Sequence, residues 1–156
     1  MTALDSFLKT LRRRTVGTGV YRPWSDWTPG VDVGPDAPSL RTAHLQAYLE
    51  ARLDRAELVL IAEAVGYQGA RFSGVPMTCE RTLLGAKPQV PPSAVFAGPK
   101  RRTSTEAIAR SAAERNGGFC EPTATIVWTT LLGLALPADR FVLWNSFAFH
   151  PHRPGE

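Results

Sequence analysis

The sequence is short of the residues that build covalent and metal-linked frameworks. Its two cysteines, Cys79 and Cys120, are too far apart to form a CxxC pair. A disulfide scaffold, a four-thiolate zinc site and an iron–sulfur cluster therefore all lack ligands. His150 and His152 flank a single proline, and the sequence offers them no third metal ligand. We expect neither a metal nor a cofactor.

Long apolar runs are missing as well. The first residues, MTALDSFLKTLRRR, contain no apolar core of a secretory signal. No stretch of the chain approaches the ~20 apolar residues that a membrane span needs. We therefore expect a cytoplasmic protein without a membrane partner, folded as a single domain over residues 1–156.

Neither sign of charge dominates the chain. Eighteen Lys and Arg residues face 14 Asp and Glu residues, which gives a net charge of +4. This mild excess permits a polyanionic partner without amounting to a polybasic signature. The cluster Lys100, Arg101 and Arg102 could follow a nucleic-acid backbone, and a solvated loop is the alternative for such a short run.

The chain does contain an alternation of helix and strand patterns. Apolar spacing predicts an amphipathic helix over 4–14. A Ser39 cap predicts a second helix over 40–55. A Thr103–Glu106 capping box predicts a third over 104–115, which the glycines of 116–118 end. Pro122 in a first turn predicts a fourth over 121–136. Short apolar runs at 57–63 and 140–147 predict buried strands. Burial is expected for the tryptophans Trp24, Trp27 and Trp128, the first two in an ordered loop over 16–38 that also carries Tyr21.

This order of elements predicts an α/β fold whose strands run parallel and are joined by helical crossovers. Ligands of such sheets bind beyond the carboxyl ends of the strands. The loops 62–78 and 145–153 each follow one of the two strands. We therefore expect these two loops to converge on one site.

The glycines of the first loop match no nucleotide motif. Gly69 and Gly74 have the spacing of a phosphate-binding loop, but Val75 and Pro76 follow where Lys and Ser or Thr are needed. A dinucleotide GxGxxG pattern is absent too. For any single glycine, a purely structural role in a turn that needs a positive φ is the alternative.

Three segments together resemble a known family. LIAEAVGYQGARFSGVPMTCER at 60–81 resembles the first signature of the uracil-DNA glycosylase superfamily, in the branch written GEAPG…GxPFT. FVLWNSFAFHPHRPG at 141–155 resembles its second signature, and EPTATIVW at 121–128 resembles the helix between them. The resemblance implies a three-layer α/β/α domain with a mostly parallel sheet, monomeric when complete. It also implies a DNA repair enzyme, without a cofactor, that flips uracil or a related deaminated base out of DNA and hydrolyses its N-glycosidic bond.

The resemblance also assigns roles to residues. Glu63 and Ala64 take the catalytic positions, with Glu63 orienting the water or stabilising charge; a strand-end carboxylate that caps nearby amides is the alternative for Glu63. Backbone N–H groups of the glycine-rich loop would stabilise the departing base anion. The positions implied for substrate binding are Ala62, Gly66, Tyr67, Met77 and Asn145. The candidates for DNA contact are the basic side chains of Arg71, Lys100, Arg101, Arg102, His150 and Arg153, and a hydrogen-bonded structural histidine is the alternative for His150.

Asn145 carries the argument for base recognition. A side-chain amide offers a donor and an acceptor that complement the adjacent C=O and N–H groups of uracil. The same amide, held in one orientation, mismatches the reversed pattern of cytosine. Without the resemblance, a turn residue that ends the strand is the alternative reading of Asn145.

The sequence departs from the family pattern at several positions. Ala62 stands in place of glycine, Val65 in place of proline, and Met77 in place of the phenylalanine that stacks on uracil. Ala64 occupies the position at which another branch has a water-activating aspartate. These departures favour an alternative, a base-binding module of the same fold that has lost catalysis. An unrelated α/β enzyme acting on a small phosphorylated substrate is the other alternative.

Family members continue past the second signature to a His-Pro loop that contacts the departing base and enters the DNA minor groove. His44, on a predicted helix, and His150 and His152, within the second signature, cannot replace that loop's histidine. We therefore expect a truncated domain with weakened activity, an exposed sheet edge and a tendency to aggregate.

Overall fold

The computed structural model describes residues 1–153 and consists of helices around two short pairs of strands. Its elements are α1 (Ala3–Arg13), β1 (Val20–Tyr21), α2 (Ala37–Glu50), β2 (Leu58–Ala64), α3 (Ala70–Ser73), α4 (Glu80–Leu83), α5 (Pro92–Val95), the 3-10 turn η1 (Glu106–Ile108), α6 (Ala112–Gly117), α7 (Pro122–Gly133), β3 (Phe141–Phe147) and β4 (His150–Pro151). The last residues of the second signature, 154 and 155, lie outside the described part of the chain. No helix within residues 1–153 combines the length and the apolar character needed to cross a bilayer.

The predicted parallel pairing of the two long strands is confirmed. β2 and β3 run parallel, with Leu58 opposite Phe141 and Ala62 opposite Asn145. The short strands β1 and β4 pair antiparallel and tie the N-terminal loop to the end of the chain. The protein is therefore a mixed helix-and-strand fold with a small parallel sheet.

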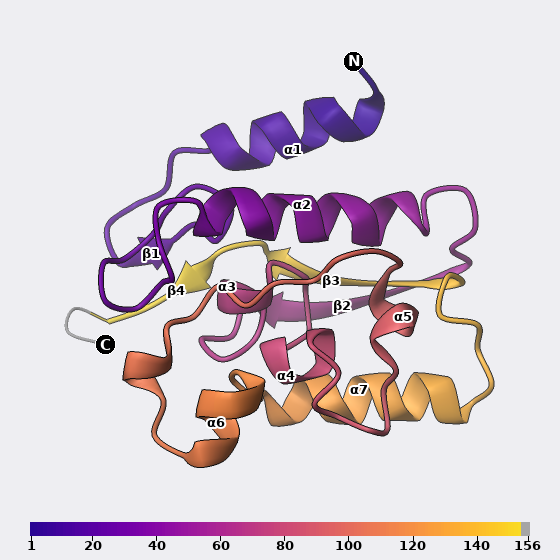
Figure 1. The fold of residues 1–156 in the computed structure, drawn as a ribbon. Helices are drawn as coiled ribbons and strands as arrows, with labels where there is room; N and C mark the ends of the chain where they lie inside the picture. The colour runs from indigo at the N-terminus through magenta and orange to yellow at the C-terminus, as the bar shows by residue number, and fades with distance from the viewer. Residues whose placement is uncertain (154–156) are drawn as a thin grey trace.

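Helices lie on both sides of the parallel pair (Figure 1). On one side α1 follows the amphipathic pattern, burying Leu4, Leu8 and Leu11, and the Phe7 ring lies 5.6 Å from that of Trp144 on β3. On the other side α7 places Trp128 with its ring 5.4 Å from that of Phe141. These contacts bury β3 between helices, because alternate residues of a strand face opposite sides.

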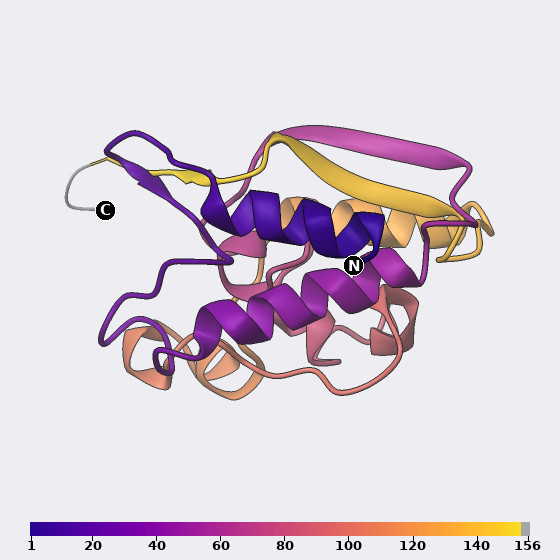
Figure 2. The same cartoon turned by 90° about the horizontal axis from the view of Figure 1, so that it is seen from above.

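The second strand is less buried than the sequence predicts. Figure 2 shows β2 at the border of the molecule, with β3 between it and the helices α1 and α2. Val59 and Ile61 are 57% and 64% exposed. The expectation of a central buried strand at 57–63 is therefore wrong, because within the described residues β2 pairs only with β3. The exposed sheet edge expected from the sequence is present.

Tyr48 of α2 and Arg52, in the turn after α2, cover the outer edge of β3. The Leu143 N–H donates to the Tyr48 hydroxyl at 2.7 Å. The Arg52 guanidinium, fully buried, donates to the Phe141 carbonyl at 3.0 Å and stacks on the Tyr48 ring. These two side chains satisfy backbone groups that a neighbouring strand would otherwise pair.

Two helix boundaries differ from the prediction. α2 begins at Ala37, with Pro38 in its first turn, so Ser39 lies inside the helix and caps nothing. The helix expected over 104–115 is broken into η1 and α6, capped by the side chains of Thr105 and Ser111. Thr103 cannot form the predicted capping box because its N–H donates to Glu80 and its hydroxyl donates to the Phe72 carbonyl.

The loop 16–38 is ordered, as predicted, around a buried ion-pair network. Asp32 accepts hydrogen bonds from Arg41 at 3.2 Å, from Arg71 at 2.8 Å and from the Tyr21 hydroxyl at 2.9 Å. Trp24 and Trp128 are buried as expected. Trp27 is 41% exposed, so its predicted burial is wrong; the interior of this loop is filled by paired charges.

Candidate functional site

The carboxyl ends of β2 and β3 enclose a cavity of about 330 Å³. Residues from both predicted loops and from the start of α7 line it: Ala62, Glu63, Ala64, Gly66, Met77, Glu121, Thr123 and Asn145. The two loops therefore converge as predicted, because the parallel register sets Ala62 beside Asn145. Six of the residues singled out from the sequence line this one cavity.

Asn145 is the most constrained polar group of the cavity. The residue is 3% exposed, and its Nδ2 donates to the Ala64 carbonyl at 2.9 Å. That bond fixes the orientation of the amide, since a carbonyl accepts only from the nitrogen end. Oδ1 is buried without a hydrogen-bond partner. A buried acceptor left unpaired is costly, so it marks a position where a ligand donor would be stabilised.

Glycines bring a carboxyl group into the same cavity. The Glu121 carboxyl packs against Gly66 and Gly69, and a Cβ at either position would clash with its oxygens. The two glycines therefore give Glu121 the room to enter, which is a packing role and not a phosphate cradle.

Burial raises the pKa of the Glu121 carboxyl above its ordinary value. Desolvation is the only cause, because no cation among the described residues lies near enough to offset it. The Glu121 carboxyl lies against Gly66 and Gly69 and lines the cavity. The group is an acid that holds its proton to a higher pH than an exposed glutamate.

Met77 and the two alanines form the apolar wall. Met77 is buried and adopts a positive φ of 50°, a backbone conformation that few residues other than glycine adopt. Ala62 and Ala64 alternate with Glu63 along β2, so their methyl groups face the same side as Asn145. The cavity thus joins an apolar wall to the Asn145 amide.

Glu63 occupies a different position from Asn145. It lines the rim of the cavity, but strand alternation directs its exposed side chain to the opposite face from Ala62 and Ala64. Its backbone carbonyl accepts a hydrogen bond from the Ser146 hydroxyl at 2.9 Å. The catalytic role of Glu63 stays a prediction, and so does the alternative of a strand-end carboxylate.

Tyr67 and His150 lie beside the cavity and not in it. They line a neighbouring hollow of about 280 Å³ together with Tyr21, Arg71 and His152. The Tyr67 ring lies edge-on to Phe72, and His150 donates from Nδ1 to the Val65 carbonyl at 2.8 Å. A ligand in the Asn145 cavity would reach Tyr67 only by extending into this second hollow.

Several of the basic residues predicted to contact DNA make hydrogen bonds or ion pairs within the protein, and one of them is buried. Arg71 is 4% exposed and ion-paired with Asp32, so its proposed DNA contact is corrected to a structural role. Lys100 donates to the Phe96 and Gly98 carbonyls, and Arg102 donates to the Ser104 hydroxyl and the Arg115 carbonyl. These hydrogen bonds within the protein would compete with the binding of Lys100 and Arg102 to a DNA phosphate. The exposed side chains of Arg101 and Arg153 keep their DNA contacts as predictions.

The described residues offer no group of three His, Cys, Asp or Glu side chains that could hold a metal ion. Cys79 and Cys120 are both free thiols. The polar side chains that line the cavity are the Asn145 amide, the carboxyl groups of Glu63 and Glu121, and the Thr123 hydroxyl.

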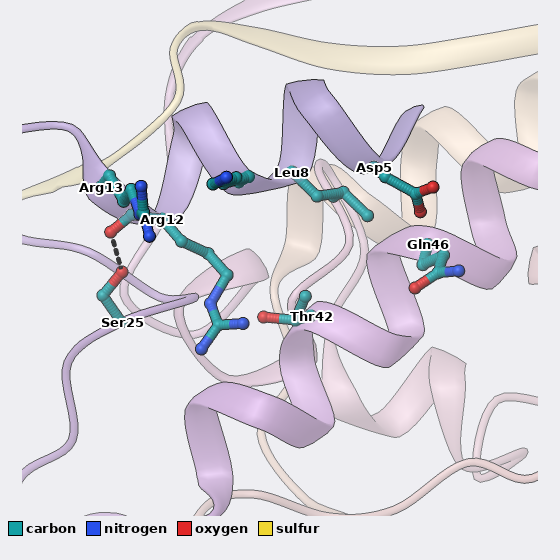
Figure 3. Close-up of a pocket in the computed structure, with 8 residues that line it drawn as sticks. Asp5, Leu8, Arg12, Arg13, Ser25, Thr42 and Gln46 are labelled. Carbon is teal, nitrogen blue, oxygen red and sulfur yellow. Dashed lines mark hydrogen bonds between the residues drawn. The ribbon is translucent and has the colours of Figure 1, made fainter. Parts of the chain in front are cut away.

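A larger hollow of about 600 Å³ lies between α1 and α2 (Figure 3). Figure 3 shows the Arg12 guanidinium directed toward Thr42, with the Ser25 hydroxyl bonded to the Arg12 carbonyl at 2.5 Å. Its charged side chains Lys9, Arg12 and Arg13 are exposed. No lining side chain of this hollow is both buried and unpartnered, so we place the functional site at the Asn145 cavity.

Comparisons with family models, with curated proteins and with solved structures found no match to this chain. The site therefore rests on its geometry alone. Sequence reasoning missed two of its lining residues, Glu121 and Thr123. A signal was present in the sequence, because an acidic residue directly before a helix-starting proline stands at the helix N-terminus, beside the sheet edge on which the loops converge.

Proposed function

We propose that the cavity binds a single flipped base of DNA, and that the protein is a glycosylase hydrolysing the N-glycosidic bond of uracil or a related deaminated base. The observation that carries the proposal is the buried, unpartnered Oδ1 of Asn145. Support also comes from the two sequence segments that resemble the glycosylase signatures and meet at this cavity. The proposed frame is the three-layer α/β/α domain of that superfamily.

The fixed amide selects among bases. With Nδ2 committed to the Ala64 carbonyl, Oδ1 must face the ligand as an acceptor. Uracil presents an N–H at position 3 to such an acceptor, whereas cytosine presents an unprotonated ring nitrogen and is repelled. The second Nδ2 hydrogen is available to the neighbouring carbonyl of uracil. A cavity near 330 Å³ lies at the small end of ligand pockets and suits one base.

The lining argues against a small phosphorylated substrate. Two carboxylate residues, Glu63 and Glu121, line the cavity, and Lys and Arg are missing from its described lining. A phosphate group would therefore meet no side-chain cation in this lining, which favours an uncharged base as the ligand.

A base-binding module without catalysis is the second candidate. Ala64 contributes only a methyl group to the wall, and the Glu63 side chain lies on the opposite face of the strand. This arrangement would bind a base, but no carboxylate from the first signature segment would be in position to activate water. Binding without base release would identify this second candidate.

The test is release of uracil from single-stranded and double-stranded oligonucleotides. Asn145→Ala should lower the affinity and the release rate at least ~10-fold, because a buried base edge loses its partner. Ser146→Ala, the neighbouring exposed position, is the matched control and should behave like the wild type. An Asn145→Ala protein that melts normally and still releases uracil at the wild-type rate would refute the proposal.

A further inference from the structure

The acid that faces the Asn145 cavity comes from outside both signature segments. Glu121 is the last residue before α7, and its carboxyl group enters the cavity through the space left by Gly66 and Gly69. It lines the same cavity as Asn145, which holds a buried unpartnered acceptor. The cavity thus combines an acceptor from β3 with an acid from the start of α7.

We infer that Glu121 is a ligand-contacting acid of this cavity, which in its neutral form donates a hydrogen bond to a carbonyl oxygen of the bound base. The inference rests on the proposed function, since it takes a base to be the ligand. It names the class of ligand more closely: a planar ring with an N–H for Asn145 and a separate C=O for Glu121.

The surroundings of Glu121 keep the neutral form available. Burial raises its pKa, and no described cation opposes that shift. Glu63 is the other titratable side chain that lines the cavity, Cys120 precedes Glu121 in the chain, and Tyr67 and His150 line the neighbouring hollow. Strand alternation directs the Glu63 side chain to the opposite face of β2, and burial of Glu121 is the cause of its raised pKa.

A neutral acid at this position fits the charge changes of base release. When the C–N bond breaks, the electron pair stays with the ring nitrogen, and negative charge spreads onto the neighbouring carbonyl oxygen. Water forms the new bond to the sugar carbon and gives a proton to solvent, and the base anion takes a proton from solvent. A hydrogen bond from neutral Glu121 to that oxygen would stabilise the developing anion, whereas an ionised carboxylate would repel it.

The experiment measures the dissociation constant of free uracil and of a uracil-containing single strand between about pH 4.5 and about pH 8.5, a range that brackets a raised glutamate pKa. For the wild type, binding should weaken as pH rises, because Glu121 loses the proton it donates. Glu121→Gln keeps an N–H donor but does not titrate, so its binding should be tight and independent of pH. Glu121→Leu should bind roughly 10-fold more weakly than the wild type at low pH.

Two matched variants separate Glu121 from other titrating groups. Glu106→Gln in η1 and Glu50→Gln in α2 each alter an exposed glutamate outside the cavity, and both should keep the pH dependence of the wild type. A Glu121→Gln protein that retains the wild-type pH dependence, or a Glu121→Leu protein that binds like the wild type, would overturn the inference.

A second readout needs no ligand. Because the folded state raises the pKa of Glu121, its contribution to stability is present at low pH and is lost as pH rises through the folded-state value. Glu121→Gln should remove that part of the pH dependence of the melting temperature. If this stability effect appears and the wild type still binds no uracil at any pH, the proposed function fails while the buried acid stands. If Glu121→Gln leaves the pH dependence of melting unchanged, the inference about Glu121 itself fails.

Discussion

The two edges of the parallel sheet meet different surroundings. Along the outer edge of β3, Tyr48 of α2 and Arg52, in the turn after α2, bond the backbone at Leu143 and Phe141. Along the outer edge of β2, no strand pairs within residues 1–153, and Val59 and Ile61 stay exposed. Two side chains can thus take the place of a neighbouring strand, but one of them is a buried cation that needs several hydrogen-bond acceptors.

The largest expected effect is at Arg52. Its guanidinium donates to the carbonyls of Phe141, Tyr48, Val95 and Ala94. Arg52→Met keeps the apolar stem and removes the donors, which should lower the free energy of unfolding by about 3 kcal/mol. Each carbonyl left buried and unpaired costs about 1 kcal/mol or more, and the variant recovers part of this because it no longer buries a cation.

Urea denaturation measures this loss. Arg55→Met is the matched control, because Arg55 is 68% exposed in its pair with Asp139 and should contribute only about 0–1 kcal/mol. Equal free energies of unfolding for the two variants would show that Arg52 does not hold the edge of β3.

A smaller loss is expected at Tyr48. Tyr48→Phe removes the hydroxyl that accepts from the Leu143 N–H, at a cost of about 1–2 kcal/mol. Amide hydrogen exchange at Leu143 should accelerate by more than the global loss of stability explains. Tyr67→Phe, at an exposed ring, serves as the control and should leave the unfolding curve in place. Unchanged protection of Leu143 would contradict the proposed edge contact.

The smallest change in stability is expected on the open edge. Val59 and Val142 are partners in the register, but only Val142 packs against the core. Val59→Lys should alter the free energy of unfolding by less than about 0.5 kcal/mol, whereas Val142→Lys should cost several times more.

Light scattering at rising protein concentration gives the second measurement on these variants. A lysine on an open edge discourages strand pairing between molecules, so Val59→Lys should associate less than the wild type. A wild-type protein that stays monodisperse at every concentration would remove the basis for this difference.

Local patterns in the sequence predicted the site better than they predicted burial. The strands, their parallel direction and the meeting of Ala62 with Asn145 follow from apolar runs and polar strand ends. The exposure of Val59 does not follow, because an apolar run reports that a strand forms and says nothing of how many neighbours it has. Truncation of the domain stays a prediction.

The missed features depend on contacts between distant segments. Glu80 accepts from the N–H groups of Thr103 and Ser104, so tertiary contacts override the helix that local signals favour there. Glu121 enters the cavity only because Gly66 and Gly69 lie opposite it in space. Neither pairing leaves a periodic trace in the sequence.

The long separation between β2 and β3 has a consequence for synthesis of the chain. Paired positions such as Glu63 and Ser146 are 83 residues apart. At a synthesis rate of about 5–20 residues per second, β2 leaves the ribosome roughly 4 to 17 seconds before its partner. For that interval the apolar run has no strand to pair with, and closing so large a loop is slow even afterwards. Until β3 emerges, the unpaired apolar strand of the nascent chain is therefore open to association with other chains.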